Sequence, residues 1–161
     1  MRTVTEHYRN EAHCIAWSGN VQVILSLEPP TSEVMRKIIS GLEALAARCA
    51  CRTGALLVIN SDCPPPDEEA RRYIRAELAR SSMVAAAQIV EGTGFRGAAM
   101  RAVLSMVQLA SRAPYPMSVF GNVPEGASWL TAELAKRAGI APDPADVVKA
   151  VIECRGRFRR R

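Results

Sequence analysis

Long hydrophobic stretches and aromatic residues are both scarce in this chain of 161 residues. Aromatic residues make up 5% of it, so we expect a core of aliphatic side chains and methionine. The longest purely apolar runs, such as Ala55 to Ile59, are far shorter than the ~20 residues that a transmembrane helix needs. The segment 1–10 has no apolar core of the kind found in signal peptides. We therefore expect a soluble, cytoplasmic protein without a membrane span.

Motifs of common hydrolases and of metal sites are absent from the sequence as well. The chain has neither the G-x-S-x-G elbow nor the S-x-x-K pattern of nucleophilic serines. Its two histidines, His7 and His13, have no cysteine or carboxylate at the helical spacing of metal ligands, which favours a structural or surface role. We therefore predict no catalytic residue, no metal site and no cofactor.

The five cysteines are an odd number, which argues against a disulfide framework. Cys49 and Cys51 form a C-x-C pattern, whereas zinc sites and thioredoxin-like sites typically use C-x-x-C. Cys63 lies where a helix start could lower the pKa of a thiol, but neighbouring acidic residues oppose that effect. We therefore expect reduced thiols throughout the chain and an inert Cys63.

The excess of positive charge is confined to one end of the sequence. Twenty-one Lys and Arg against sixteen Asp and Glu give a net charge of +5. Residues 155–161 contain five arginines and no acidic residue, so the rest of the chain is balanced. We predict a single domain over residues 1–154 and a disordered, solubilising tail over residues 155–161. Nucleic-acid binding through the arginines of this tail is an alternative.

Strand-like and helix-like patterns alternate along the chain. Turn residues 18–20 separate two β-like runs, which indicates an antiparallel hairpin. The uniformly apolar run 55–59 is typical of a central parallel strand that is buried on both faces. Further strands are predicted over 83–90 and 117–120, and helices over 32–48, from near 67, over 95–112, between 124 and 139, and from 143 to about 154. This order predicts a single α/β domain with a mixed, mostly parallel sheet of about five strands flanked by helices.

The helix predicted over 95–112 is apolar over most of its circumference. The exceptions form one polar stripe, which consists of Arg101, Ser105, Gln108 and Arg112. We expect the helix to be deeply packed and the stripe to be a solvated face. Formation of a homodimer through this helix is an alternative.

A glycine-rich loop, Gly92-Thr93-Gly94-Phe95-Arg96-Gly97, stands between a predicted strand and that helix. In dinucleotide-binding enzymes, glycines at this spacing let a pyrophosphate approach free amides at a helix N-terminus. The acidic residue expected ≈ 20 positions later is missing here, which favours a tight turn with close helix packing. A small enzyme that binds a phosphate or nucleotide with Gly92, Thr93, Gly94 and Arg96 stays open as an alternative.

Five segments form a familiar series: the N-terminal hairpin, the helix begun by Pro-Pro-Thr-Ser, the strand ALLVINSD, the helix DEEARRYIRAEL and the segment GFRGAAMRAVLSMVQLASRAPYPMSVFGNVPEGASWL. From roughly Ala12 to Leu134 the chain resembles bacterial STAS-like proteins, relatives of the anti-sigma-factor antagonists. The resemblance implies a mixed sheet flanked by helices in a non-enzymatic switch or adaptor that binds other proteins. It also allows a small apolar ligand held against the sheet.

The same resemblance implies a phosphorylatable serine at the start of the helix after the third predicted strand, within an Asp-Ser-Ser-Gly motif. This chain has Asn-Ser-Asp-Cys-Pro-Pro-Pro-Asp there, so Ser61 is the nearest candidate although the motif itself is missing. We therefore predict a regulatory or adaptor domain whose partner-binding face includes Ser61, Asp62 and Asp67.

Overall fold

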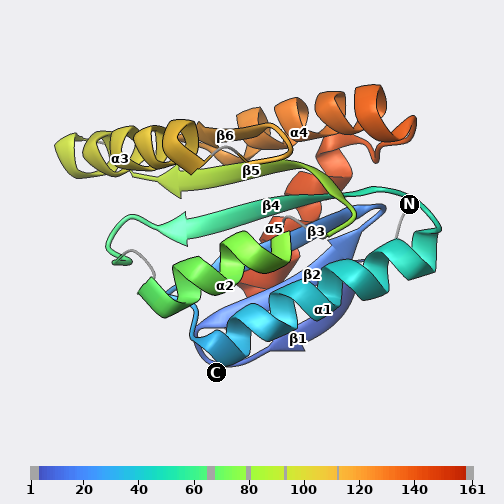
Figure 1. The fold of residues 1–161 in the computed structure, drawn as a ribbon, viewed down its shortest axis with the longest axis horizontal. Helices are drawn as coiled ribbons and strands as arrows, with labels where there is room; N and C mark the ends of the chain where they lie inside the picture. Colours follow the sequence, from blue (N-terminus) through green and yellow to red (C-terminus); the bar gives the residue numbers. More distant parts are fainter. Residues whose placement is uncertain (1–3, 65–67, 79–80, 93, 112, 159–161) are drawn as a thin grey trace.

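The computed structural model describes residues 4–64, 68–78, 81–92, 94–111 and 113–158, and its centre is a six-stranded sheet (Figure 1). The strands lie in their order along the chain: β1 (Thr5–Arg9), β2 (His13–Ser18), β3 (Val21–Ser26), β4 (Thr53–Asn60), β5 (Met83–Glu91) and β6 (Met117–Phe120). β1, β2 and β3 pair antiparallel, whereas β3, β4, β5 and β6 pair parallel. The predicted α/β domain with a mixed, mostly parallel sheet is confirmed.

Strand β1 is the element that the sequence analysis does not predict, so the sheet has one strand more than the expected five. Its residues Glu6 and Arg9 are exposed, and its register with β2 shifts between Glu6 and Tyr8. A short edge strand with polar side chains and a bulge lacks a regular hydrophobic alternation. Pairing with β2, rather than a local pattern, therefore defines β1.

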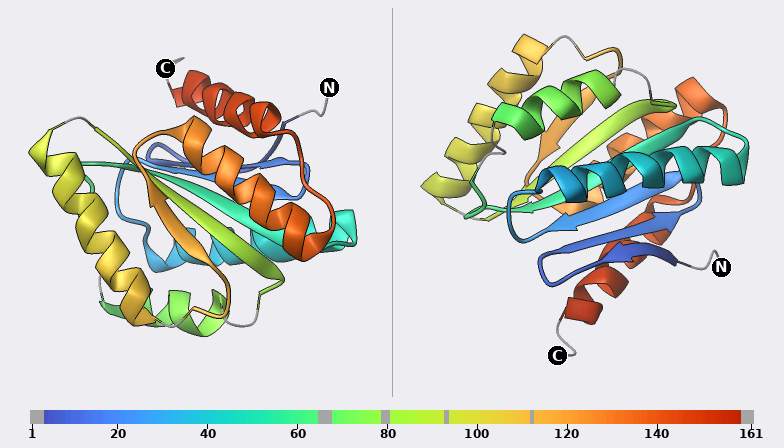
Figure 2. Two further views of the ribbon diagram at one scale, coloured as in Figure 1. Left: turned by 90° about the horizontal axis from the view of Figure 1, so that it is seen from above. Right: turned by 60° about the horizontal axis from the view of Figure 1, so that its bottom comes forward.

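Helices cover both faces of the sheet (Figure 2). In chain order they are α1 (Ser32–Cys49), α2 (Glu68–Leu78), α3 (Phe95–Ser111), α4 (Val123–Ala138) and α5 (Pro144–Phe158). α1 and α2 lie on one face, α4 and α5 lie on the other, and α3 contacts β5 and β6 at the end of the sheet. Within the described part of the chain, no helix is both long enough and apolar enough to cross a membrane.

Alternate side chains of the strands build one core on each face of the sheet. The core beneath α1 includes Ile15, Ile24, Ile38, Leu42 and Ala55. The core beneath α4 and α5 includes Val23, Leu56, Ile89, Leu130, Leu134, Val147 and Val151. β4 contributes Ala55 to the first core and Leu56 to the second, which confirms the predicted burial on both faces. Each fully buried Leu or Ile contributes about 1.5–3 kcal/mol relative to an exposed one.

The helix ends follow local signals in the sequence. Thr31 accepts a hydrogen bond from the Val34 amide (3.3 Å) and Asn122 accepts one from the Glu125 amide (2.9 Å). Pro124 stands in the first turn of α4, and Gly139 ends this helix with a φ of 70°. A left-handed residue after a helix favours glycine because glycine has no Cβ to clash. The predicted helix start at residue 32 and the predicted helix boundaries near residues 124 and 139 are confirmed.

Helix α5 continues into the segment that the sequence analysis assigns to a disordered tail, and it ends at Phe158. Arg155 forms an ion pair with Glu91 of β5. Arg157 forms an ion pair with Glu6 of β1 (2.6 Å). These carboxylates hold the two arginines against the sheet, so the prediction of a tail from residue 155 is wrong for 155–158. Residues 159–161 lie outside the described residues.

Replacement of Leu130 tests the core beneath α4. Its side chain is fully buried, and it lies 3.1 Å from the position that a Cβ on Gly54 would take. We expect Leu130→Ala to lower the free energy of unfolding by about 2–5 kcal/mol, because it leaves a cavity. Ile152→Ala is the control, since Ile152 of α5 is 60% exposed, and its effect should stay within about 0.5 kcal/mol. Urea unfolding measures both, and equal losses would contradict this core.

Candidate functional site

Two groups of predicted site residues lie side by side at the carboxyl edge of the parallel strands. Asn60 at the end of β4 is paired with Glu91 at the end of β5. Ser61 and Asp62 follow the first strand, and Gly92 follows the second. A Cβ built on Gly92 would lie 3.5 Å from the Ser61 hydroxyl oxygen. The predicted partner face and the predicted anion loop are therefore parts of one surface.

A salt bridge links the loop after β4 to the first turn of α3. Arg96 Nη1 lies 2.8 Å from Asp62 Oδ1, and both side chains are largely exposed, at 81% and 64%. An exposed pair of this kind stabilises a fold by only about 0–1 kcal/mol, so a partner can displace it at little cost. Asp67 and Thr93, the other predicted members of these groups, lie outside the described residues.

Contacts with helix α3 fix the backbone of the glycine-rich loop. Arg101 Nη1 donates hydrogen bonds to the carbonyl oxygens of Val90 (3.0 Å) and Gly92 (3.2 Å). A Cβ on Gly97 would lie 2.7 Å from the Gly92 oxygen, so this glycine allows the close approach of helix and loop. Gly92 and Gly94 have φ values of 144° and 90°, which other residues rarely adopt. The glycine spacing therefore serves a tight turn with close packing.

The prediction that the polar stripe on α3 is a solvated face is wrong for Arg101. Its side chain is half-buried, and its guanidinium also lies 3.7 Å from the position that a Cβ on Gly121 would take. Arg101 therefore connects the loop after β5 with the loop after β6. The spacing of the stripe did not reveal this role, because backbone carbonyl partners leave no pattern in a sequence.

Helix α3 is not deeply packed, contrary to the prediction. Phe95 is 89% exposed, Met106 is 70% exposed and Val103 is 55% exposed. At 100° per residue these three side chains fall within about 80° of one another around the helix. Ala98 and Ala102 are exposed on the same side. We call these five residues the α3 stripe. Its N-terminal end, Phe95, adjoins Arg96, which forms the ion pair with Asp62.

The two histidines have structural partners. Buried His13 donates from Nε2 to the Glu28 carbonyl oxygen (3.0 Å), and His7 stacks on the Trp17 ring with centroids 4.8 Å apart. Burial lowers the pKa of both histidines, and Lys37 lowers that of His7 further. The described residues contain no group of three or more side chains suited to hold a metal ion.

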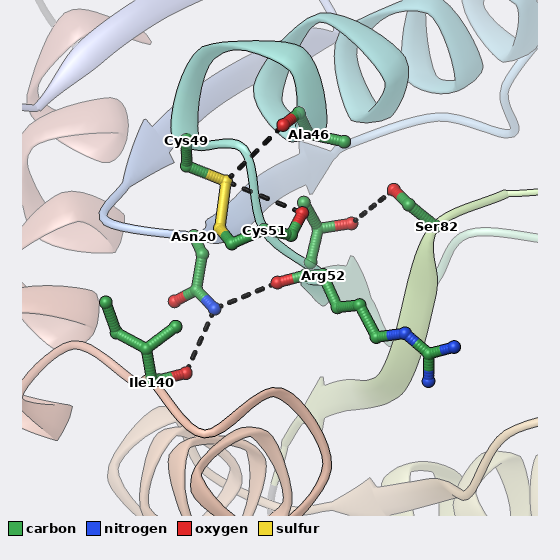
Figure 3. Close-up of a disulfide and its surroundings, with 8 residues drawn as sticks. Asn20, Ala46, Cys49, Cys51, Arg52, Ser82 and Ile140 are labelled. Carbon is green, nitrogen blue, oxygen red and sulfur yellow. Dashed lines mark hydrogen bonds between the residues drawn. A yellow bond between two sulfur atoms is a disulfide. The ribbon is translucent and has the colours of Figure 1, made fainter.

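A disulfide between Cys49 and Cys51 contradicts the expectation of reduced thiols (Figure 3). α1 ends at Cys49, and Ala50 adopts a left-handed conformation with a φ of 48°. This turn brings the two Cα atoms to 5.2 Å, within the range that a disulfide requires. The C-x-C pattern at a helix end is the sequence signal for this disulfide. The bond can form only because Ala50 adopts the left-handed conformation.

The other three cysteines, Cys14, Cys63 and Cys154, are free and buried. Burial raises the pKa of Cys63, which agrees with an inert thiol. Cys14 and Cys154 share a hydrogen bond between β2 and α5, which lowers the pKa of Cys14 and raises that of Cys154. None of these three thiols lies at the carboxyl-edge surface in an exposed position.

Two pockets lie at the opposite, amino edge of the parallel strands. One has a volume of about 370 Å³ and borders Asn20 and the Cys49–Cys51 disulfide. The other has a volume of about 320 Å³ and borders Ser82 and Tyr115. Neither is lined by the loops after β4 and β5.

Comparisons of the chain with protein-family models, curated proteins and solved structures find no match. The function is therefore argued from the residues of this chain.

The lowered histidine pKa values predict a pH dependence of stability. Below the ordinary histidine pKa of about 6.5 the unfolded chain binds protons that the folded chain does not, so stability falls as the pH falls. The slope for one histidine stays below about 1.4 kcal/mol per pH unit. His13→Gln should flatten the curve measured by denaturant unfolding from about pH 7.5 to 5, because glutamine does not titrate. An unchanged slope in both His13→Gln and His7→Gln would contradict this origin.

Gly97→Ala tests the close packing of the glycine-rich loop. The new methyl group would meet the Gly92 carbonyl oxygen at 2.7 Å, so we expect a loss of about 1–3 kcal/mol in unfolding free energy. Gly156→Ala in α5 is the control, because nothing lies within 4 Å of its Cβ position and alanine gains up to about 1 kcal/mol in a helix. Equal stabilisation of both variants would show that the loop is not tightly packed.

Proposed function

We propose that this chain is a non-enzymatic regulatory module that binds another protein through the α3 stripe, the neighbouring Arg96 and the loop residues Ser61 and Asp62. The observation that carries the proposal is the exposure of the stripe, which places a phenylalanine, a valine and a methionine in water on one helix face. Contiguous exposed apolar side chains with a polar rim are typical of protein-binding surfaces. Aromatic residues and methionine are enriched at the centres of such surfaces.

The charges of α3 indicate the chemistry of the partner. The helix contains arginines but no acidic residue, and exposed Arg96 stands beside Phe95. We infer that the partner presents an apolar helix face flanked by a carboxylate. That carboxylate would replace Asp62 as the ion-pair partner of Arg96, in an exchange that conserves charge pairing.

Ser61 gives the proposal a regulatory element. The resemblance to STAS-like proteins implies a phosphorylatable serine near this position, and the loop of Ser61 adjoins the loop that leads to Arg96. A phosphate there would add negative charge beside the Asp62–Arg96 pair and compete for the arginine. Modification of Ser61 would therefore change the charge of the same surface that meets the partner.

The two alternative functions have less support. A nucleotide-binding enzyme needs loop groups that face a phosphate, whereas Arg101 occupies the inner side of the glycine-rich loop. Nucleic-acid binding through the C-terminal arginines is opposed by the ion pairs of Arg155 and Arg157. Both observations favour the protein-binding module.

Affinity capture from a lysate of the native host tests the proposal. The wild-type chain should retain one stoichiometric protein that survives nuclease treatment. The double variant Phe95→Asp, Met106→Asp should weaken its capture at least about tenfold, because central apolar contacts dominate most interfaces. Ile152→Asp is the matched control, since Ile152 is an exposed apolar residue on α5, and it should leave capture unchanged.

Three results would contradict the proposal. The double variant could capture the partner as well as the wild type. The captured material could be nucleic acid. Light scattering could show a dimer of the wild-type chain that the double variant turns into a monomer, which would make a second copy the occupant of the α3 stripe. Circular dichroism of each variant separates these results from loss of the fold.

A further inference from the structure

The Cys49–Cys51 disulfide (Figure 3) lies in the wall of a pocket of about 370 Å³. This pocket is at the amino edge of the sheet, whereas the surface proposed above is at the carboxyl edge. The same wall includes Trp17, Asn20, Leu45, Arg48 and Ile140. A volume of this size is at the lower end of the range for small-molecule sites. A ligand in this pocket would therefore touch an oxidised pair of cysteines.

Three features separate this disulfide from a structural cross-link. It closes a loop of three residues, and the shortest loops gain least from closure. Both cysteines are half-buried, whereas the three free cysteines are buried. Both cysteines also line a pocket, where a dissolved thiol can reach them.

We propose that the Cys49–Cys51 pair is a thiol–disulfide exchange centre that oxidises thiols carrying a carboxylate, such as cysteine-containing peptides.

The carbonyl groups around Cys49 assign the roles of the two sulfurs. Cys49 Sγ lies 3.8 Å from the Ala46 oxygen and 3.6 Å from the Cys51 oxygen, at the C-terminal end of α1. These oxygens disfavour a thiolate on Cys49 but accept a hydrogen bond from its neutral thiol. Cys51 is therefore the better leaving group, and Cys49 carries the mixed disulfide.

The exchange conserves atoms and electrons. A substrate thiolate attacks Cys49 Sγ, the Cys49–Cys51 bond breaks, and Cys51 leaves as a thiolate that takes a proton from water. A second substrate thiolate attacks the sulfur of the bound substrate and releases Cys49, which is also protonated. Two substrate thiols become one disulfide, and the protein pair gains the two electrons.

Arg48 provides the selectivity for a carboxylate. Its guanidinium donates to the Thr5 hydroxyl oxygen (3.2 Å) and lies 5.7 Å from the centre of the Trp17 ring. Within the described part of the chain it forms no ion pair with a carboxylate. A positively charged group is thus fixed beside the disulfide with its charge uncompensated.

Asn20 adds a second recognition group. Its side-chain nitrogen donates to the carbonyl oxygens of Arg52 (3.0 Å) and Ile140 (3.1 Å), as Figure 3 shows. Its side-chain oxygen is buried and has no hydrogen-bond partner. A buried acceptor without a donor is costly, and an N–H group of a peptide in the pocket would satisfy it after a small adjustment. A peptide thiol therefore fits this pocket better than a simple alkyl thiol.

The test reacts the oxidised full-length chain with reduced glutathione, a peptide thiol with carboxylates, and with cysteamine, a thiol with an ammonium group. Reactions are quenched by alkylation and followed by mass spectrometry. At equal thiolate concentrations glutathione should react about five times faster, because Arg48 attracts its carboxylates. The first adduct should be on Cys49. Salt should reduce the advantage of glutathione.

Two arginine variants make the result specific. Arg48→Ala should bring the two thiols to equal rates. Arg52→Ala is the matched control, because Arg52 is exposed and lines the other pocket, and it should keep the difference. The proposal is overturned if Cys49 and Cys51 both stay alkylatable after treatment with diamide, a strong thiol oxidant, if the adduct forms on Cys51, or if the wild-type chain reacts equally fast with both thiols.

Discussion

The parallel pairing of β4 with β5 is the interaction on which the rest of the structure depends. The two strands stay in register from Gly54 and Ala85 to Asn60 and Glu91, and helices cover them on both faces. Because both strands run in the same direction, the loops that leave them meet at one edge and the loops that lead into them meet at the other. The proposed partner surface occupies the first edge, and the pocket beside the disulfide lies at the second. The sheet therefore separates the two proposed sites by the length of its parallel strands.

Much of the fold can be predicted from local patterns, because the composition of the central strands requires that they be buried. The run 55–59 is apolar at every position, so a strand there must be buried on both faces. β1 and the end of α5 have no such local signal. Arg157 of α5 and Glu6 of β1 are paired across the fold, and a contact between residues so distant in sequence leaves no pattern in either segment. Tertiary contacts therefore determine the formation of β1 and the extent of α5.

The candidate sites also combine features that the sequence predicts with features that it does not. Ser61 and Gly92 follow successive strands in the sequence, and the rule for parallel strands places both at one edge of the sheet. No motif in either segment shows that the two belong to one surface. The exposure of Phe95 could not be predicted, since an apolar helix has the same sequence pattern whether it is covered by its own domain or by a partner. The disulfide depends on the backbone of Ala50, which adopts a conformation that alanine seldom takes. Each of these outcomes rests on a placement in space rather than on a residue type.

The bulge in β1 has a consequence for how the molecule behaves at high concentration. An outermost strand offers free backbone groups that can extend the sheet into a neighbouring molecule, which leads to aggregation. The shifted register between Glu6 and Tyr8 and the charged side chains of Glu6 and Arg9 oppose such an extension at β1. At the other border, β6 has four residues and offers few groups for pairing. The protein can therefore expose the apolar side chains of α3 while its sheet resists growth from either border.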